Sequence, residues 1–133
     1  MTKDVRWKQR FQNFERAFLF LKEAVEQEKY DKLQAAGLVQ SFEFTFELAW
    51  KTLKDYLAMQ GEIIPFPREV LKKAFSAQLI QNGHVWIEML DKRNQLSHTY
   101  NDAQATKAVD LIRKTYFPEI EQVYETLKDL CSD

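Results

Sequence analysis

The apolar positions of residues 7–25 recur with the period of a helix. They follow one another in alternating steps of four and three residues: Trp7, Phe11, Phe14, Phe18, Leu21 and Val25. This spacing places every one of these side chains on one stripe, so it predicts an amphipathic helix that continues towards Tyr30. Asp31 is a suitable N-cap residue for a second helix.

Residues 38–57 carry two overlapping patterns. Large apolar residues occupy alternate positions from Phe42 to Trp50, which is typical of a strand. A second set keeps helical spacing over twenty residues: Leu38, Phe42, Phe46, Ala49, Leu53, Tyr56 and Leu57. We predict a helix because this set is longer, because no other segment offers a strand to pair with, and because Lys51 lies one turn from both Glu47 and Asp55. Gly61 is a suitable C′ residue at its end.

Phe44 and Leu48 lie outside the main apolar stripe of this second helix. The helix is therefore expected to bury more than one face, either within a bundle or at an oligomer interface.

The rest of the chain also favours helices. We expect Pro65 and Pro67 to mark a loop and Pro118 to kink or restart the last helix. The predicted elements are a short helix over 68–79, a turn at 82–83, a helix from about His84, a turn and cap at 101–102, and a helical region over 102–130. The predicted fold is all-α, an antiparallel four-helix up-and-down bundle with an extra short helix and a kinked C-terminal helix, in a single domain spanning 1–133.

Composition fits a soluble folded chain, with 45% hydrophobic and 29% charged residues. The net charge of −1 does not indicate nucleic-acid binding. The single cysteine, Cys131, cannot form an internal disulfide and suggests a reducing compartment. No signal-peptide h-region and no apolar run of membrane-spanning length occurs, so we expect a cytoplasmic protein with no membrane partner.

Residues 93–100, Arg-Asn-Gln-Leu-Ser-His-Thr-Tyr, are the main candidates for chemistry, and we call them the octet. Arginine binds phosphate, and histidine transfers protons near neutral pH. His98 would act as general acid or base on a ribose hydroxyl while Arg93 steadies the phosphate charge, without a metal. On a continuous helix the two lie about 140° apart, so they converge only if the helix ends near Ser97 or if both face a groove shared with a second chain.

Each octet residue also has a structural interpretation. Arg93 lies close to the apolar stripe of its helix, where a charge needs a partner, a ligand or an interface. In the structural interpretation, Arg93 forms a salt bridge, and His98 donates a hydrogen bond at the C-terminus of the helix. Tyr100 is either packed, or lines a phosphate site, or accepts a modifying group. These alternatives stay open on spacing alone.

Several other signatures are absent from the sequence or ambiguous. Glu43 and Glu47 share one helical face, but no Glu-x-x-His helix accompanies them, so surface or interface ion pairs are favoured over a metal site. Phe42, Phe46 and Trp50 have the spacing of core residues rather than of a base-stacking platform. The sequence has no Gly-rich phosphate loop, no zinc-type cluster, and no Gly-Ser pair followed by spaced aspartates. We expect no cofactor or metal in this chain.

Residues 40–51, Gln-Ser-Phe-Glu-Phe-Thr-Phe-Glu-Leu-Ala-Trp-Lys, resemble the nucleotidyltransferase substrate-binding protein family of the HEPN superfamily. Pro67-Arg68, Trp86 and the octet extend the resemblance over about residues 5–130. It implies a fold like the helical C-terminal domain of kanamycin nucleotidyltransferase. It also implies a homodimer with a cleft near its interface, and a separate small nucleotidyltransferase that holds the metal and the nucleoside triphosphate.

The resemblance implies a substrate- or nucleotide-binding subunit. In it Arg93 contacts a phosphate or acidic group, Asn94 orients its neighbours, and His98 and Tyr100 line the cleft. A related HEPN branch of toxin ribonucleases carries Arg-x4-His-x-Tyr, which Arg93, His98 and Tyr100 match. That branch implies the alternative of a metal-independent endoribonuclease, with Arg93 and His98 catalytic and Tyr100 adenylylated by a nucleotidyltransferase antitoxin. A purely structural adaptor, which needs neither Arg93 nor His98, is a third possibility.

Overall fold

The computed structural model describes residues 2–96 and 101–132, and within them it is all-α with no strand. The predicted all-α bundle is confirmed. Its elements are α1 (Lys3–Val25), α2 (Lys32–Met59), α3 (Pro67–Ser76), α4 (Gly83–Leu96), α5 (Asp102–Leu111), the π-helical turn η1 (Ile112–Tyr116) and α6 (Phe117–Cys131).

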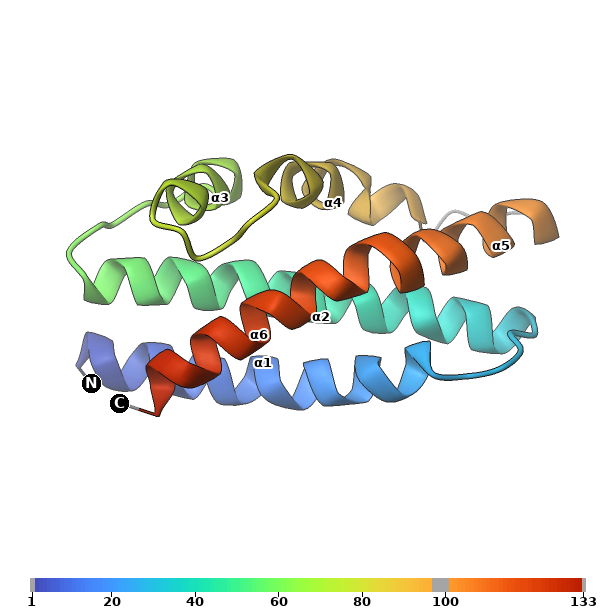
Figure 1. The fold of residues 1–133 in the computed structure, drawn as a ribbon, viewed down its shortest axis with the longest axis horizontal. Helices are drawn as coiled ribbons and strands as arrows, with labels where there is room; N and C mark the ends of the chain where they lie inside the picture. The colour runs from blue at the N-terminus through green and yellow to red at the C-terminus, as the bar shows by residue number, and fades with distance from the viewer. Residues whose placement is uncertain (1, 97–100, 133) are drawn as a thin grey trace.

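Helix α2 occupies the centre of the bundle. Figure 1 shows α1 and α2 as a long antiparallel pair, α6 crossing both obliquely, and α3 and α4 on the side of α2 that faces away from α1. Helix α5 also contacts α2. Because neighbours surround it, α2 buries side chains over a wide arc, including the polar Ser41, Thr45, Thr52 and Asp55. This arrangement explains the long helical apolar set, whereas the alternation from Phe42 to Trp50 includes Phe44, which is exposed.

Aromatic side chains form much of the core on either side of α2. Between α1 and α6, the rings of Phe18 and Tyr124 stack with centroids 4.2 Å apart. On the other side, the Phe46 ring lies 5.9 Å from Trp86 of α4. Phe42, Phe46 and Trp50 are all buried, so their prediction as core residues is confirmed.

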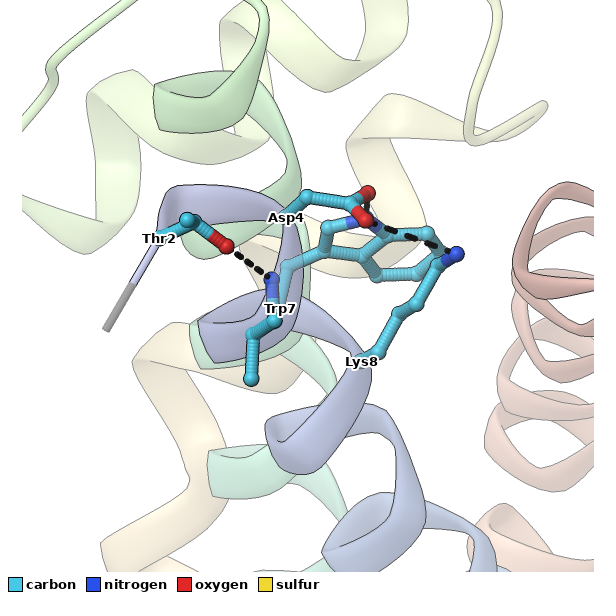
Figure 2. Close-up of polar contacts among 5 residues, drawn as sticks. Thr2, Asp4, Trp7 and Lys8 are labelled. Atoms are coloured by element: carbon cyan, nitrogen blue, oxygen red, sulfur yellow. Dashed lines mark hydrogen bonds and ion pairs between the residues drawn. The ribbon is translucent and has the colours of Figure 1, made fainter.

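The helix starts follow the sequence signals. The Thr2 hydroxyl accepts the Val5 amide at 3.1 Å, and in the first turn of α1 the Asp4 carboxylate accepts the Trp7 indole N–H at 3.3 Å (Figure 2). Asp31 caps α2, as predicted, and forms a complete capping box with Gln34. Asn101 caps α5 by accepting the amide of Gln104 at 2.8 Å.

Two helix ends use the same left-handed geometry with different residues. Gly61, at φ +97°, follows α2, and the Glu62 amide donates to the Leu57 carbonyl at 2.8 Å, which confirms Gly61 as the C′ residue. Helix α3 ends in the same motif with Gln78 at φ +62° in place of glycine. Because no glycine signals this end, the sequence placed it at Leu79, three residues beyond the observed Ser76.

Two other expectations need correction. Helix α1 ends at Val25 rather than near Tyr30, and the chain then turns back so that the Tyr30 hydroxyl donates to the Ala24 carbonyl at 2.6 Å. The predicted pairs of Lys51 with Glu47 and Asp55 do not form. Each carboxylate is held instead by an arginine from another helix, Asp55 by Arg10 at 3.0 Å and Glu47 by Arg93.

Pro118 interrupts the last helix, as predicted. It lacks an amide hydrogen, and the turn just before it, η1, is π-helical, with the Phe117 amide donating to the Ile112 carbonyl. The extra residue in this turn changes which side chains of α6 face the core.

Candidate functional site

Arg93 is anchored between α4 and α2. Its Nη1 donates to Oε1 of Glu47, and its guanidinium lies 6.0 Å from the centre of the buried Phe46 ring. The Arg93 side chain is 25% exposed. The expectation that a charge at this position needs a partner is confirmed, and that partner is Glu47.

Glu47 is itself fixed from a second direction. Its other oxygen, Oε2, accepts the indole N–H of Trp50 at 3.1 Å. The carboxylate therefore holds the guanidinium in one orientation. Among the described residues, Nη2 and Nε of Arg93 have no hydrogen-bond partner.

The other octet residues are only partly placed. Asn94 follows Arg93 on α4 and its side chain is exposed. His98 and Tyr100 lie outside the described residues, so their predicted roles stay predictions. The structure thus places the arginine of the motif at the end of α4.

An exposed apolar surface lies beside this pair. Phe44 is on α2 one turn before Glu47 and is 61% exposed, and Phe20 of α1 is 65% exposed. Together with a hollow of about 320 Å³, they form what we call the α1–α2 apolar face. The hollow is lined by Ala17, Phe20, Gly37, Gln40, Ser41, Phe44 and Thr45. Of the two alternatives for Phe44, burial inside the bundle is therefore wrong for a single chain.

A second hollow, of about 340 Å³, lies where α4 reaches Leu96. It is lined by Lys92, Gln95, Leu96, Gln104, Lys107, Ala108 and Leu111. Sequence reasoning missed this hollow because its two walls come from α4 and α5, whose relative placement no local pattern encodes.

The Glu47 carboxylate belongs to an ion pair and a hydrogen bond. Glu47 is shared by Arg93 and Trp50, which supports the ion-pair interpretation of the Glu43-x-x-x-Glu47 pattern. In the part of the chain that the structure describes, no three His, Cys, Asp or Glu side chains gather as a metal site would require. In the same part, no helix is both long and apolar enough to cross a membrane.

Two buried tyrosines have structural rather than chemical roles. The Tyr124 hydroxyl donates to Glu15 at 2.6 Å, and the Tyr116 hydroxyl donates to Glu88 at 2.7 Å. Burial, reinforced by the carboxylate that accepts each hydrogen bond, raises the pKa of both phenols well above the usual value of 10.0. Both phenols stay protonated and join α6 and η1 to the helices that they contact.

One known protein resembles this chain in sequence, and another resembles it in structure. The Haemophilus influenzae protein described as probable ribonuclease HepT is 33% identical over an alignment of 75 residues, and the match covers 53% of this chain and 51% of that protein. The chain thus spans about half the length of this relative. A crystal structure of ttk003001694 from Thermus thermophilus superposes with a TM-score of 0.73 at 27% identity, covering 90% of this chain and 99% of that one.

A family description matches nearly the whole sequence. Residues 9–129 match the family described as nucleotidyltransferase substrate binding protein like. The match includes α2, Trp86 and the octet, which are the segments on which the resemblance was identified. The chain therefore belongs to the nucleotidyltransferase substrate-binding protein-like family.

Proposed function

We propose that this chain is a substrate- or nucleotide-binding subunit that associates with a separate minimal nucleotidyltransferase in the cytoplasm. The observation that carries the proposal is the Arg93 guanidinium, which contacts Glu47 and the Phe46 ring and whose Nη2 and Nε have no hydrogen-bond partner among the described residues. A preoriented guanidinium binds phosphate or carboxylate oxygens with little loss of side-chain entropy. The metal and the nucleoside triphosphate belong to the partner, whose aspartate motif this sequence lacks.

We assign the anion contact to Arg93 and the lining of the cleft to Asn94, His98 and Tyr100. Family membership supports this assignment, and so does the position of Arg93 at the exposed end of α4. Arg93 supplies charge and direction, whereas the neighbouring polar side chains supply selectivity for the rest of the ligand.

The proposed subunit is a homodimer joined through the α1–α2 apolar face. Two exposed phenylalanines beside a hollow form a surface that water solvates poorly. Phe20 lies between Arg16 and Glu23 on α1, and all three side chains are exposed. When two copies of α1 cross antiparallel at Phe20, Arg16 of each copy faces Glu23 of the other, as a twofold interface requires.

A reconstitution experiment tests the association. The purified chain is mixed with a minimal nucleotidyltransferase from the same organism, and the complex is measured by size-exclusion chromatography with light scattering. Wild type and Arg93→Gln are both expected to join the complex, while Arg93→Gln raises the KM of the complex for its acceptor substrate. Failure of the wild-type chain to associate would remove the proposal.

The similarity to a probable ribonuclease favours a second candidate function, a metal-independent endoribonuclease. In it, His98 accepts the proton of a ribose 2′-hydroxyl, the 2′-oxygen attacks phosphorus, and the 5′-oxygen leaves and takes up a proton. Arg93 stabilises the negative charge that develops on the phosphate. A partner nucleotidyltransferase would silence the enzyme by transferring AMP to Tyr100.

RNA cleavage in a metal chelator tests this candidate. Wild type and His98→Ala are compared after intact mass has shown that Tyr100 carries no adenylyl group. Cleavage by the wild type alone supports the ribonuclease. Intact RNA in the presence of an unmodified wild-type chain contradicts it and leaves the binding subunit.

A further inference from the structure

A further hollow lies between α3 and α4, two helices that Figure 1 shows next to each other on the side of α2 that faces away from α1. We call it the α3–α4 hollow, and its volume is about 420 Å³. Helix α3 contributes Leu71, Lys72 and Phe75 to its lining, and α4 contributes Gly83, His84 and Ile87. None of these residues belongs to the octet or to the α1–α2 apolar face.

The two helices contact each other at both ends of the hollow. Near the turn that joins them, the Phe75 ring packs against the backbone of Gly83, where a Cβ atom would lie 3.2 Å from the ring. Farther along both helices, Nη2 of Arg68 donates to Oδ1 of Asp91 at 2.5 Å. These contacts fix the spacing of α3 and α4, so the α3–α4 hollow is formed without a ligand, as binding sites for small molecules usually are.

Phe75 is a large apolar side chain that the single chain leaves 53% exposed. Its neighbour Gly83 does not have a positive φ, so the backbone of α4 does not require glycine at this position. The absence of a Cβ instead lets the ring approach α4 closely. Together with Leu71 and Ile87, the exposed part of the ring offers a flat ligand an aromatic and aliphatic contact surface.

The charge of the hollow comes from one side chain. Lys72 is the only lysine or arginine among the described residues that line it, and no aspartate or glutamate is among them. Lys72 forms no ion pair within the described part of the chain, whereas the neighbouring Lys73 pairs with Glu62 at 3.5 Å. His84 and Gln81 add polar groups that can form hydrogen bonds with a ligand.

These features select a flat ligand with a single negative charge. One lysine is a compact point charge that balances one carboxylate, whereas a nucleoside triphosphate carries several negative charges. Phe75 lies one turn after Lys72 on α3, so a ring that carries a carboxylate directly or through a short linker can contact both side chains. A ligand that is polar throughout would lose hydrogen bonds to water against the apolar lining.

We propose that the α3–α4 hollow is a binding site for a small aromatic carboxylate. The ring packs against Phe75 and Ile87, and the carboxylate lies at Lys72, where His84 and Gln81 are within the same lining. This site goes beyond the proposed function, because it shares no residue with the anion site at Arg93 and neither site needs the other.

The test is a titration of the full chain, followed by ligand-observed NMR, with cinnamate, its uncharged amide cinnamamide, and acetate. Cinnamate and cinnamamide have nearly the same shape, so the difference between their affinities measures the contribution of the charge. The wild type is expected to bind cinnamate roughly three- to fivefold more tightly than cinnamamide, as an ion pair at an exposed position contributes. Acetate, which has no ring, is expected not to bind measurably.

Two variants and a matched control locate the binding. Lys72→Gln is expected to bind cinnamate and cinnamamide equally, because it lacks the charge that distinguishes them. Lys73→Gln is the control, since Lys73 is the neighbouring lysine but does not line the hollow, and it is expected to keep the preference for cinnamate. Gly83→Ala is expected to weaken the binding of both compounds, because the added methyl group enters the hollow and displaces the Phe75 ring.

Loss of the preference in Lys72→Gln, together with weaker binding of both compounds by Gly83→Ala, supports the site. Lys72 is exposed, so its variant is expected to stay folded and decides the outcome if Gly83→Ala unfolds. The proposal is overturned if the wild type binds neither compound or binds both equally. It is also overturned if Lys73→Gln loses the preference as Lys72→Gln does, or if a folded Gly83→Ala binds both compounds as the wild type does.

Discussion

At the scale of single residues, the site depends on a pair of charges that are far apart in the sequence. Position alone indicated that Arg93 needs a partner, because it follows the apolar stripe of α4. The identity of that partner was not predictable, since Glu47 is 46 residues away and reaches Arg93 only through the packing of α4 on α2. Local reasoning had assigned Glu47 to Lys51, a weaker pair on the same helix.

Replacing Glu47 by glutamine is expected to lower the free energy of unfolding by about 1 kcal/mol. The change keeps the shape of the side chain but removes the charge that Arg93 contacts in a partly exposed setting. Urea denaturation measures the loss. Glu62→Gln, which alters an exposed pair with Lys73, is the control and is expected to change stability less. Equal losses in the two variants would show that the Arg93–Glu47 pair has no special role.

The buried phenols make stability fall at alkaline pH. Tyr124 and Tyr116 have folded-state pKa values above 10.0, so the unfolded chain loses these protons first as pH rises. Their contribution is complete below pH 10 and is lost progressively above it. Denaturation midpoints at pH 9 and pH 11 measure the fall, which Tyr124→Phe is expected to reduce. A fall as large in Tyr124→Phe as in the wild type would contradict the assignment.

At the scale of the elements, the sequence predicted helices best where a cap or a stop residue accompanied the apolar period. Asp31, Asn101 and Gly61 fixed boundaries that the structure confirms. The end of α3 was misplaced because Gln78 adopts a left-handed conformation without being glycine. The hollow between the end of α4 and α5 was not predictable, since it arises from the meeting of two helices rather than from either one.

Gln78→Gly is expected to stabilise the protein by about 0.5–1 kcal/mol. A residue with a Cβ is strained at φ +62°, and glycine relieves the strain while the end of α3 keeps its hydrogen bonds. Gly61→Ala is expected to change stability in the opposite direction, because Gly61 has a φ of +97°. Chemical denaturation of both variants measures the direction of each change in the free energy of unfolding. A destabilised Gln78→Gly variant would contradict this explanation of the helix end.

At the scale of the whole molecule, the fold brings an apolar face and a charged site onto neighbouring parts of α2. Phe44 and Glu47 are one turn apart, so a second copy docked on the α1–α2 apolar face lies next to Arg93. The sequence indicated that Phe44 needed a burial site, and a single chain does not provide one. The proposed dimer would therefore both cover the face and enclose the site.

Replacing Phe20 and Phe44 together by serine is expected to convert the dimer into a folded monomer. Both rings are exposed in the single chain, so the monomer loses little packing while the interface loses its apolar contacts. Sedimentation equilibrium measures the mass. The control replaces Ile63 and Phe66, which are 72% and 65% exposed in the loop before α3. A wild-type monomer, or a control that also dissociates, would contradict the assigned interface.

The central claim is that Arg93 is an anchored anion site. It is tested most directly by isothermal titration calorimetry of the purified chain with ATP, in the presence of a metal chelator. Arg68→Gln is the matched control, because Arg68 also pairs with one carboxylate, that of Asp91, but belongs to α3 and is not part of the octet. The account predicts that wild type and Arg68→Gln bind alike. Arg93→Gln is expected to bind at least tenfold more weakly, as the loss of a charge-assisted contact worth about 1.5–3 kcal/mol requires. Equal binding by Arg93→Gln and the wild type, or no binding by the wild type, would contradict it.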